Sequence, residues 1–333
     1  MDLFGGAAIC QGPRNLMAPI YHAIPIGITV EGANILTRSL IVFGQGAIRA
    51  HPFLLREMEA TRDPNPVTAL QSFDRAFFGH IAFSLRNGVR TLFLGLTNGW
   101  PIEAPLAGMP HHHFRRLSRM SAAFALTADL SLALLQGKLK RKESLSGRMA
   151  DVLSHLYLAS AALKRFHDDG QPAEDLPLVD WSIEESLFHI QKGLSEVLDN
   201  FPSRPIAWVL KAIIFPFGLP YKKPSDQLVL QLAKITMAPS ATRDRLTRGV
   251  FLPDDPNEPL AALEDALIQC LSVEEMENKI RRAGHAGDLD GAMKSGVITL
   301  LDASRLLLAA RARNHCIQVD DFKPVFHYKE KAA

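Results

Sequence analysis

Residues 34–59, NILTRSLIVFGQGAIRAHPFLLREME, decide the fold because they place apolar side chains at the spacing of an α-helix. Gly44, Gly46 and Pro52 interrupt that spacing. Proline lacks a backbone donor and its ring clashes with the preceding turn, so we expect one long helix that is bent or broken near Pro52. Asn34, near its start, belongs to the residue types that cap helices.

The rest of the chain keeps the same helical spacing. A polar stretch at 61–66 separates residues 1–60 from the remainder. Beyond it the pattern predicts helices at about 67–96, 112–135, 143–167, 181–200, 206–215, 226–234, 260–271, 274–283 and 294–313. Strand signals are few and no internal repeat is evident. We therefore expect an all-α protein.

Composition narrows the classes of protein. The chain has 333 residues, 47% of them hydrophobic and 22% charged, which is ordinary for a globular protein. A net charge of +2 gives no electrostatic reason to bind nucleic acid. Cys10, Cys270 and Cys316 are far apart, which predicts neither a disulfide framework nor a zinc site. Because the chain also lacks a signal-peptide pattern and an apolar run of about 18 residues, we expect a cytoplasmic protein.

One carboxylate stands inside an apolar run. Glu31 is flanked by Ile26, Ile28, Val30 and Ile35. Apolar surroundings disfavour the charged form of a carboxylate and raise its pKa toward the range of a base that works at neutral pH. A Glu-Gly pair also marks solvated turns and helix starts, and these residues alone leave both interpretations open.

Several segments together resemble a known family. Residues 1–6 (MDLFGG), 29–39 (TVEGANILTRS) and 43–49 (FGQGAIR) resemble the end of the catalytic region of an acyl-CoA dehydrogenase, most closely the long bacterial enzymes of the FadE type. Residues 139–143, 151–161, 175–179 and 238–243 resemble the C-terminal extension of those enzymes. The resemblance implies that residues 1–60 end the dehydrogenase's C-terminal helical bundle and that residues 61–333 form a larger α-helical extension.

The resemblance also implies a reaction. Members of the family use FAD to convert a medium- or long-chain acyl-CoA into a trans-2-enoyl-CoA in fatty-acid β-oxidation. By position, Glu31 is the catalytic base and, with Gly32, contacts the substrate, because its own backbone N–H binds the thioester oxygen. The flavin contacts fall on five residues: Asp2, Gly5, Gly6, Ala33 and Asn34. Many members have threonine where this chain has Ala33, so one hydroxyl contact is lost.

The family further implies partner proteins and two additional domains. An electron-transfer flavoprotein accepts the electrons, and the enzymes are homo-oligomers. A helical domain and a β-domain precede this region in the family and hold much of the flavin, so we expect the chain to be inactive alone. The alternative is a noncatalytic helical module that serves oligomerisation or membrane docking.

Other residues carry weaker signals. His111, His112 and His113 suggest a metal site, but adjacent histidines cannot easily face one ion, so we expect a solvated loop and no metal. Asp129 and Asp151 lie on apolar helices and are expected to cap or to form pairs.

Two segments carry basic groups. The group at 138–142 is expected to be a solvated helix tip, and the group at 243–248 is expected to pair with Asp254 and Asp255. The apolar stretch 206–217 is expected in the core, with peripheral contact to the inner membrane as the alternative.

Overall fold

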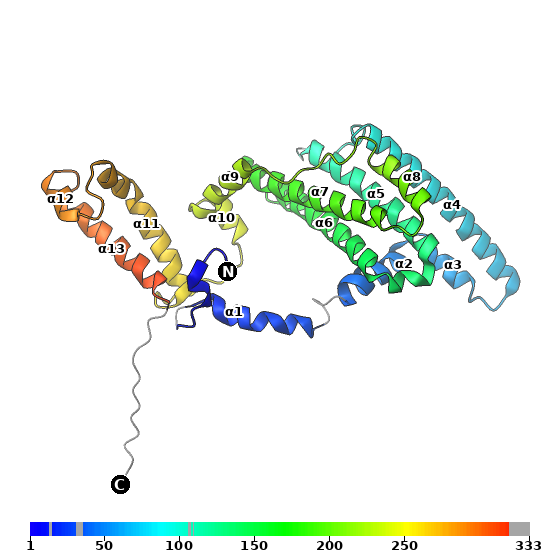
Figure 1. The fold of residues 1–333 in the computed structure, drawn as a ribbon, viewed down its shortest axis with the longest axis horizontal. Helices are drawn as coiled ribbons and strands as arrows, with labels where there is room; N and C mark the ends of the chain where they lie inside the picture. Colours follow the sequence, from blue (N-terminus) through cyan, green and yellow to red (C-terminus); the bar gives the residue numbers. More distant parts are fainter. Residues whose placement is uncertain (13–14, 31–35, 106–107, 109, 320–333) are drawn as a thin grey trace, which may run out of the picture. The chain divides into compact units, whose positions relative to one another are not determined.

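The computed structural model describes residues 1–12, 15–30, 36–105, 108 and 110–319 (Figure 1). Within these ranges the chain forms helices joined by turns and contains no β-strand, which confirms the all-α prediction. The chain divides into two units. Unit 1 comprises Met1–Ile26 and Asp244–Ala333, and unit 2 comprises Gly27–Arg243. The predicted division at residues 60 and 61 falls inside unit 2 and stays a prediction.

Unit 1 is built on a pair of helices from the end of the chain. Its elements are η1 (Gly5–Ile9), α1 (Met17–Ala23), α11 (Pro259–Arg282), α12 (Leu289–Lys294) and α13 (Leu300–Ile317). Helices α11 and α13 pack together, and their core includes Val273, Ile280, Ala303, Leu306 and Ala309.

Two helix predictions in unit 1 were wrong. The two helices predicted at 260–271 and 274–283 are the single helix α11, because residues 271–274 contain no glycine or proline that would end it. The helix predicted at 294–313 is α13, which begins only at Leu300, while Lys294 is the last residue of α12. Gly296, with φ of +72°, follows the end of α12, and Thr299 and Asp302 form a capping box that starts α13.

Unit 2 is a bundle of long helices. In chain order it contains η4 (Thr37–Gln45), α2 (Gly46–Ala50), α3 (Leu54–Ala60), α4 (Pro66–Leu96), α5 (His111–Leu135), η5 (Gln136–Arg141), α6 (Glu143–Asp168), η6 (Ala173–Asp175), α7 (Leu176–Asp199), α8 (Arg204–Ile214) and α9 (Asp226–Met237). The short helix α10 (Ala241–Leu246) follows α9. The break predicted near Pro52 is confirmed, since α2 ends at Ala50 and α3 begins at Leu54.

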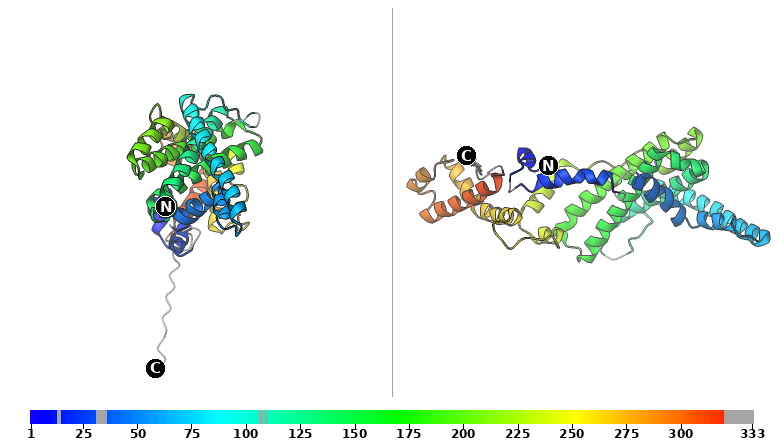
Figure 2. Two further views of the ribbon diagram at one scale, coloured as in Figure 1. Left: turned by 90° about the vertical axis from the view of Figure 1, so that its right-hand side faces the viewer. Right: turned by 90° about the horizontal axis from the view of Figure 1, so that it is seen from below.

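The core of unit 2 lies among α5, α6 and α7. Met120, Met149, Ile183, Ile190 and Leu194 are fully buried there. Helix α4 lies at the outer edge of the bundle and packs on α3, α5 and α8 (Figures 1 and 2). Gly95 permits the contact with α8, because a Cβ at this position would lie 3.0 Å from the Ile213 carbonyl oxygen.

Helix α5 is the element with the strongest membrane-like composition. Residues 111–139 are long and apolar enough to cross a membrane, but half of the qualifying window is buried in the bundle. Its buried polar side chains Arg119 and Asp129 make hydrogen bonds to other helices. These features are those of a core helix in a helical bundle.

Candidate functional site

The backbone of the glycine pair near the start of the chain, Gly5 and Gly6, is not covered by other parts of the described chain. Gly5 begins η1 with φ of +54°, a left-handed conformation that favours glycine. A Cβ on Gly5 or Gly6 would meet no atom within 4 Å, and Asp2 is exposed. The backbone of this segment is therefore accessible to another molecule.

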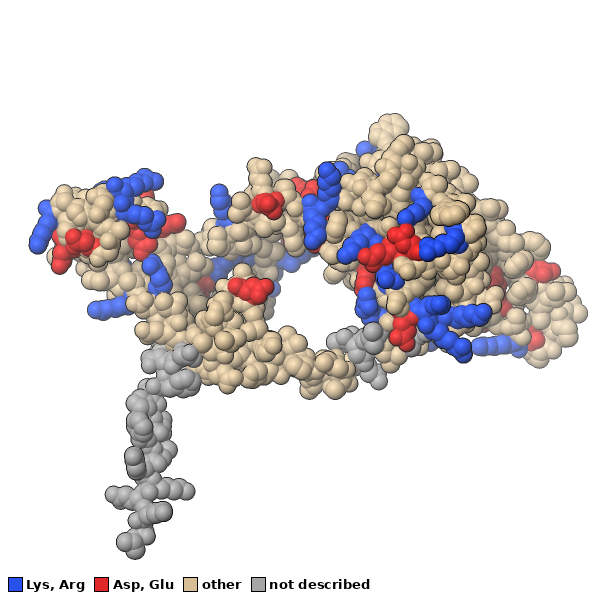
Figure 3. Space-filling model, in the orientation of Figure 1, with Lys and Arg blue, Asp and Glu red and all other residues tan. Residues whose placement is uncertain are grey.

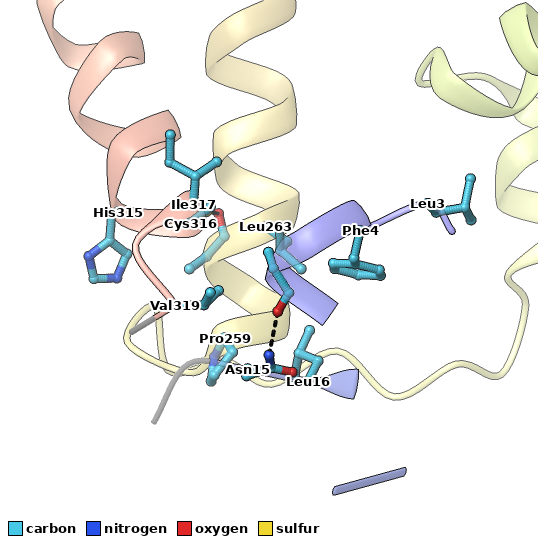
Figure 4. Close-up of a pocket in the computed structure, with 12 residues that line it drawn as sticks. Leu3, Phe4, Asn15, Leu16, Pro259, Leu263, His315, Cys316, Ile317 and Val319 are labelled. Atoms are coloured by element: carbon cyan, nitrogen blue, oxygen red, sulfur yellow. Dashed lines mark hydrogen bonds between the residues drawn. The ribbon is translucent and has the colours of Figure 1, made fainter. Parts of the chain in front are cut away.

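An apolar pocket of about 240 Å³ lies beside this segment, within unit 1 (Figure 4). Leu3, Phe4, Ala7, Asn15 and Leu16 line it from the first part of the chain, and Pro259, Ala262, Leu263, His315, Cys316, Ile317 and Val319 line it from α11 and the end of α13. Asn15 stabilises the part of the lining that comes from the start of the chain. Its Nδ2 donates to the Ala7 carbonyl oxygen at 2.6 Å, and its Oδ1 accepts the backbone N–H groups of Met17 and Ala18.

The predicted base and its neighbours fall outside the described residues. This holds for Glu31, Gly32, Ala33 and Asn34. The side chains of Ile26, Ile28 and Val30, which precede them, are exposed. The apolar surroundings expected for Glu31 stay a prediction.

The segment that follows Glu31 is fixed to helix α6. Arg38, in η4, forms two hydrogen bonds with the Asp151 carboxylate, one of them 2.7 Å from Nε to Oδ1. Gly147 makes room for this pair, because a Cβ there would lie 2.8 Å from Arg38 Nη1. Phe43, one turn further along η4, is buried in the core of unit 2. The prediction that Asp151 forms a pair is thus confirmed.

A second polar cluster joins α3, α4 and α5. His80 Nδ1 lies 2.8 Å from Glu57 Oε1, and His80 Nε2 lies 2.8 Å from Asp129 Oδ1. Ser84 donates its hydroxyl to the other Asp129 oxygen, and His51 Nε2 lies 3.4 Å from Asp129 Oδ1. Asp129 is therefore a paired residue, as its position on an apolar helix predicted.

The pKa values of this cluster shift in opposite directions. Burial alone lowers the pKa of His80, but its hydrogen bonds to Asp129 and Glu57 outweigh burial and the net pKa is raised. Burial alone raises the pKa of Asp129, but His51, Ser84 and His80 outweigh it and the net pKa is lowered. Both shifts favour the charged pair, a protonated His80 beside an ionised Asp129.

The proton positions argue against a metal ion in this cluster. The ligand atoms of His51, His80 and Asp129 are close enough to hold one. However, His51 Nδ1 accepts the backbone N–H groups of Phe53 and Leu54, which places the proton of the neutral ring on Nε2. A protonated Nε2, 3.4 Å from Asp129 Oδ1 without a completed hydrogen bond, has no lone pair for a metal.

The three adjacent histidines form the first turn of helix α5 and are not all solvated, contrary to the predicted solvated loop. His111 and His112 are exposed, but the side chain of His113 is 1% exposed and its Nε2 lies 2.6 Å from Asp180 Oδ1 on α7. Burial lowers the pKa of His113 and outweighs the opposing effect of Asp180, so His113 is a neutral donor that ties α5 to α7.

The two basic groups are the remaining candidates. In the basic run at 138–142, Lys138, Arg141 and Lys142 are exposed while Leu139 is buried, which confirms the solvated helix tip for these three residues. Pairing of the arginines at 243–248 with Asp254 and Asp255 stays a prediction.

Helix α8 carries two kinds of surface. Ala207, Leu210 and Ile214 are buried, which confirms core packing for one side of α8, whereas Trp208 and Val209 are exposed.

Comparison with known families decides the identity of the chain. The family described as "Acyl-CoA dehydrogenase, C-terminal, bacterial type" matches residues 48–322, which is most of the chain. The chain belongs to this family. No solved structure matches the chain.

The matched range shows which of the clusters described above belong to the family's domain. The matched region begins inside α2 and contains the Glu57–His80–Asp129 cluster, the His113–Asp180 pair and α8. The glycine pair and the Glu31 segment precede the matched region. The family match thus confirms the resemblance to the C-terminal part of an acyl-CoA dehydrogenase, and it supports an acyl-CoA dehydrogenase-type function. The roles of individual residues stay predictions.

Proposed function

We propose that this chain supplies the catalytic base of a FAD-dependent dehydrogenase acting on medium- or long-chain acyl-CoA in fatty-acid β-oxidation. The observation that carries the proposal is the anchoring of the segment after Glu31: Arg38 and Phe43 hold η4, which directly precedes the matched family domain, against α6 within that domain. A base must be held within hydrogen-bond reach of the proton that it removes. Helix α6 provides a fixed support for the segment that carries the base.

Glu31 then has two tasks. Its carboxylate removes the proton from the carbon next to the thioester carbonyl, and its backbone N–H, beside Gly32, binds the thioester oxygen where negative charge develops. Bound FAD would supply the acceptor for the hydride that leaves the adjacent carbon. The product is a trans-2-enoyl-CoA.

The described flavin-contact residues fit such a cofactor. Asp2 is exposed, and the open backbone at Gly5 and Gly6 lets the edge of a large anionic cofactor approach closely. Ala33 and Asn34 complete the proposed contacts. We further propose that an electron-transfer flavoprotein reoxidises the enzyme, that the assembly is a homo-oligomer in the cytoplasm, and that the family's preceding helical and β-domains are needed for activity.

The test is dye reduction with palmitoyl-CoA and FAD, measured on the chain alone and after addition of the family's preceding domains. Glu31→Gln is compared with Glu143→Gln, an exposed glutamate at the start of α6. We expect no activity from the chain alone, and activity in the supplemented protein that is lost in Glu31→Gln and kept in Glu143→Gln. Equal activity of both variants would refute the role of Glu31.

Absorbance of bound FAD separates a missing base from a missing cofactor. The Glu31→Gln protein should retain flavin, because its substitution removes a charge and leaves the glycine segment intact. A colourless supplemented protein would contradict the flavin proposal itself.

A second candidate function, a helical docking module, has its own observation. Trp208 on α8 is 69% exposed beside exposed Val209, which favours peripheral contact with the inner membrane. Flotation with anionic vesicles at low salt tests it. We expect the wild type to float and Trp208→Glu to stay in solution; wild type that does not float would refute the contact.

A further inference from the structure

Arg119, on α5, is a buried arginine that has only neutral hydrogen-bond partners. Its side chain is 3% exposed. Nη1 donates to Asn98 Oδ1 at 3.1 Å and to the Tyr221 hydroxyl oxygen at 3.3 Å, and Nη2 donates to the Ile214 carbonyl oxygen at 3.2 Å. Nε has no hydrogen-bond partner in the described part of the chain. A buried guanidinium without a counterion is costly, so an anion close to it would be stabilising.

The contacts of Arg119 decide how Asn98 and Tyr221 present their own hydrogens. Arginine can only donate, so each of the two residues must turn an oxygen lone pair toward it. The groups that remain, the Asn98 Nδ2 amide and the Tyr221 O–H, are donors, and neither finds an acceptor within the described chain. Burial raises the pKa of Tyr221 and outweighs the opposing effect of Arg119, so the phenol keeps its proton at neutral pH.

The same two side chains line a pocket of about 240 Å³ in unit 2, which we call the Tyr221 pocket. Three cations and one carboxylate complete its polar lining, which leaves two positive charges uncompensated. Lys223 Nζ lies 5.4 Å from the centre of the Phe188 ring. The lining comes from the turn after α4, from α5, from α7 and from the connection between α8 and α9, and its residues are Asn98, Arg116, Glu184, Pro220, Tyr221, Lys222 and Lys223.

Both donors are held in place from outside the pocket. The buried side chain of Gln191, on α7, donates through Nε2 to the Tyr221 carbonyl oxygen and accepts the Tyr221 N–H at Oε1, both at 2.9 Å. Next to Asn98, Gly99 has φ of +77°, and a Cβ there would lie 2.7 Å from the Arg115 carbonyl oxygen. The turn therefore packs directly on α5. Donors fixed in this way lose little freedom when a ligand binds.

Basic side chains alone do not mark a site on this protein. Figure 3 shows lysines and arginines over much of the visible face of unit 2, with carboxylates among them. The Tyr221 pocket differs because a buried arginine turns two neutral side chains into donors beside three cations. A phosphate group offers several acceptor oxygens and up to two negative charges, which matches such a lining.

We propose that the Tyr221 pocket binds a phosphate group. The Tyr221 O–H and the Asn98 Nδ2 amide donate to its oxygens, and Arg116, Lys222 and Lys223 supply the counter-charge. Glu184 is the one lining carboxylate, and its charge opposes the anion. The phosphate group belongs either to a soluble compound or to a lipid headgroup, and the experiments below separate these sources.

The phosphate site does not depend on the proposed dehydrogenation, because none of the residues named for the base or the flavin contacts lines the pocket. Failure of the proposed reaction leaves phosphate binding unaffected, and absence of phosphate binding leaves the proposed reaction unaffected.

Isothermal titration calorimetry of the full chain with inorganic phosphate at low salt is the first test. We expect one site whose Kd weakens about tenfold or more in Tyr221→Phe, because a hydrogen bond to a charged group is lost while the ring stays. Tyr157→Phe, at an exposed tyrosine on α6, is the matched control. Lys222→Ala should weaken binding and Lys142→Ala, at an exposed lysine outside the pocket, should not. Glu184→Gln should tighten binding, because it removes the opposing charge.

Asn98→Asp separates a phosphate site from a purely structural role of these residues. The new carboxylate would pair with Arg119, so resistance to urea should be kept or increased. The same carboxylate replaces the amide donor at the pocket, so phosphate binding should be lost. Asn314→Asp, at an exposed asparagine on α13, is the control and should change neither property. Phosphate binding that is unchanged in both Asn98→Asp and Tyr221→Phe would overturn the proposal.

Flotation with vesicles that contain phosphatidic acid identifies the source of the phosphate. Flotation that is lost in Tyr221→Phe and kept in Trp208→Glu would assign the phosphate to a lipid headgroup. Binding of inorganic phosphate without such flotation would assign it to a soluble phosphate compound. A wild-type chain that binds neither inorganic phosphate nor these vesicles would overturn the proposal.

Discussion

Replacing Asp129 by asparagine should destabilise unit 2 strongly and in a pH-dependent way. The side chain of Asp129 is 3% exposed and holds contacts to His80, Ser84 and His51 at once. Removing one partner of a buried charge pair costs about 3–5 kcal/mol. Because Glu57 remains 2.8 Å from His80, we expect the lower end of that range, about 3 kcal/mol.

The pH dependence follows from the two pKa shifts. The pKa of folded His80 is raised, so its contribution is complete below the unfolded value of about 6.5 and is lost as pH rises through the folded pKa. The pKa of folded Asp129 is lowered, so its contribution is present above the unfolded value of about 3.9 and is lost only as pH falls through the folded pKa. The difference between wild type and Asp129→Asn should therefore be largest between about pH 4 and pH 6.5 and should shrink at higher pH.

Tryptophan fluorescence during urea unfolding measures this difference in unit 2 alone. All three tryptophans, Trp100, Trp181 and Trp208, belong to unit 2. Asp226→Asn, at an exposed aspartate in the first turn of α9, is the control and should change the free energy of unfolding by less than about 1 kcal/mol. A loss below about 1 kcal/mol in Asp129→Asn at pH 5.5, or a loss that grows toward pH 9, would refute the charged network.

Three further substitutions test other contacts. Gly95→Ala should cost about 1–3 kcal/mol in the fluorescence assay, because the added methyl group would lie 3.0 Å from the Ile213 carbonyl oxygen, while Gly88→Ala, in the same helix with open space around it, is the control; equal losses would contradict the contact. Thr299→Ala should lose about 1 kcal/mol of unit 1 stability, measured by circular dichroism, because it removes the capping box of α13; no change would contradict the cap. Gly5→Ala should be destabilising by about 1 kcal/mol because of its positive φ, whereas Gly6→Ala should be nearly neutral, and the reverse order would contradict the conformation of η1.

The long helices were predictable because periodicity and end signals agree in them. Asn65 caps α4 by accepting the Val67 N–H, and Pro66 occupies the first helical position, as the sequence pattern favours. The failure at 294–313 had a readable cause: Thr299 and Asp302 have capping-box spacing and Gly296 precedes them. The prediction from apolar spacing ignored these signals and therefore started the helix at 294 instead of Leu300.

The buried cluster was beyond sequence reasoning for a different reason. His51, His80 and Asp129 come from separate elements, and nothing local brings them together. Only Asp129 was noticeable, as a charge on an otherwise apolar helix. His80 carries a comparable signal, because it interrupts the apolar residues of α4, but its partner can be identified only from the packing of α4 on α5.

The exposed isoleucines before Glu31 connect stability with the proposed chemistry. Ile24, Ile26 and Ile28 are mostly exposed, and burying such a side chain is worth about 1.5–3 kcal/mol. A surface that covers them gains this free energy and at the same time removes water from the neighbourhood of Glu31, which raises the pKa of a carboxylate. The Arg38–Asp151 contact fixes residues that follow this segment to α6. A surface that covers the isoleucines would therefore couple the stability of the folded chain to the role proposed for Glu31.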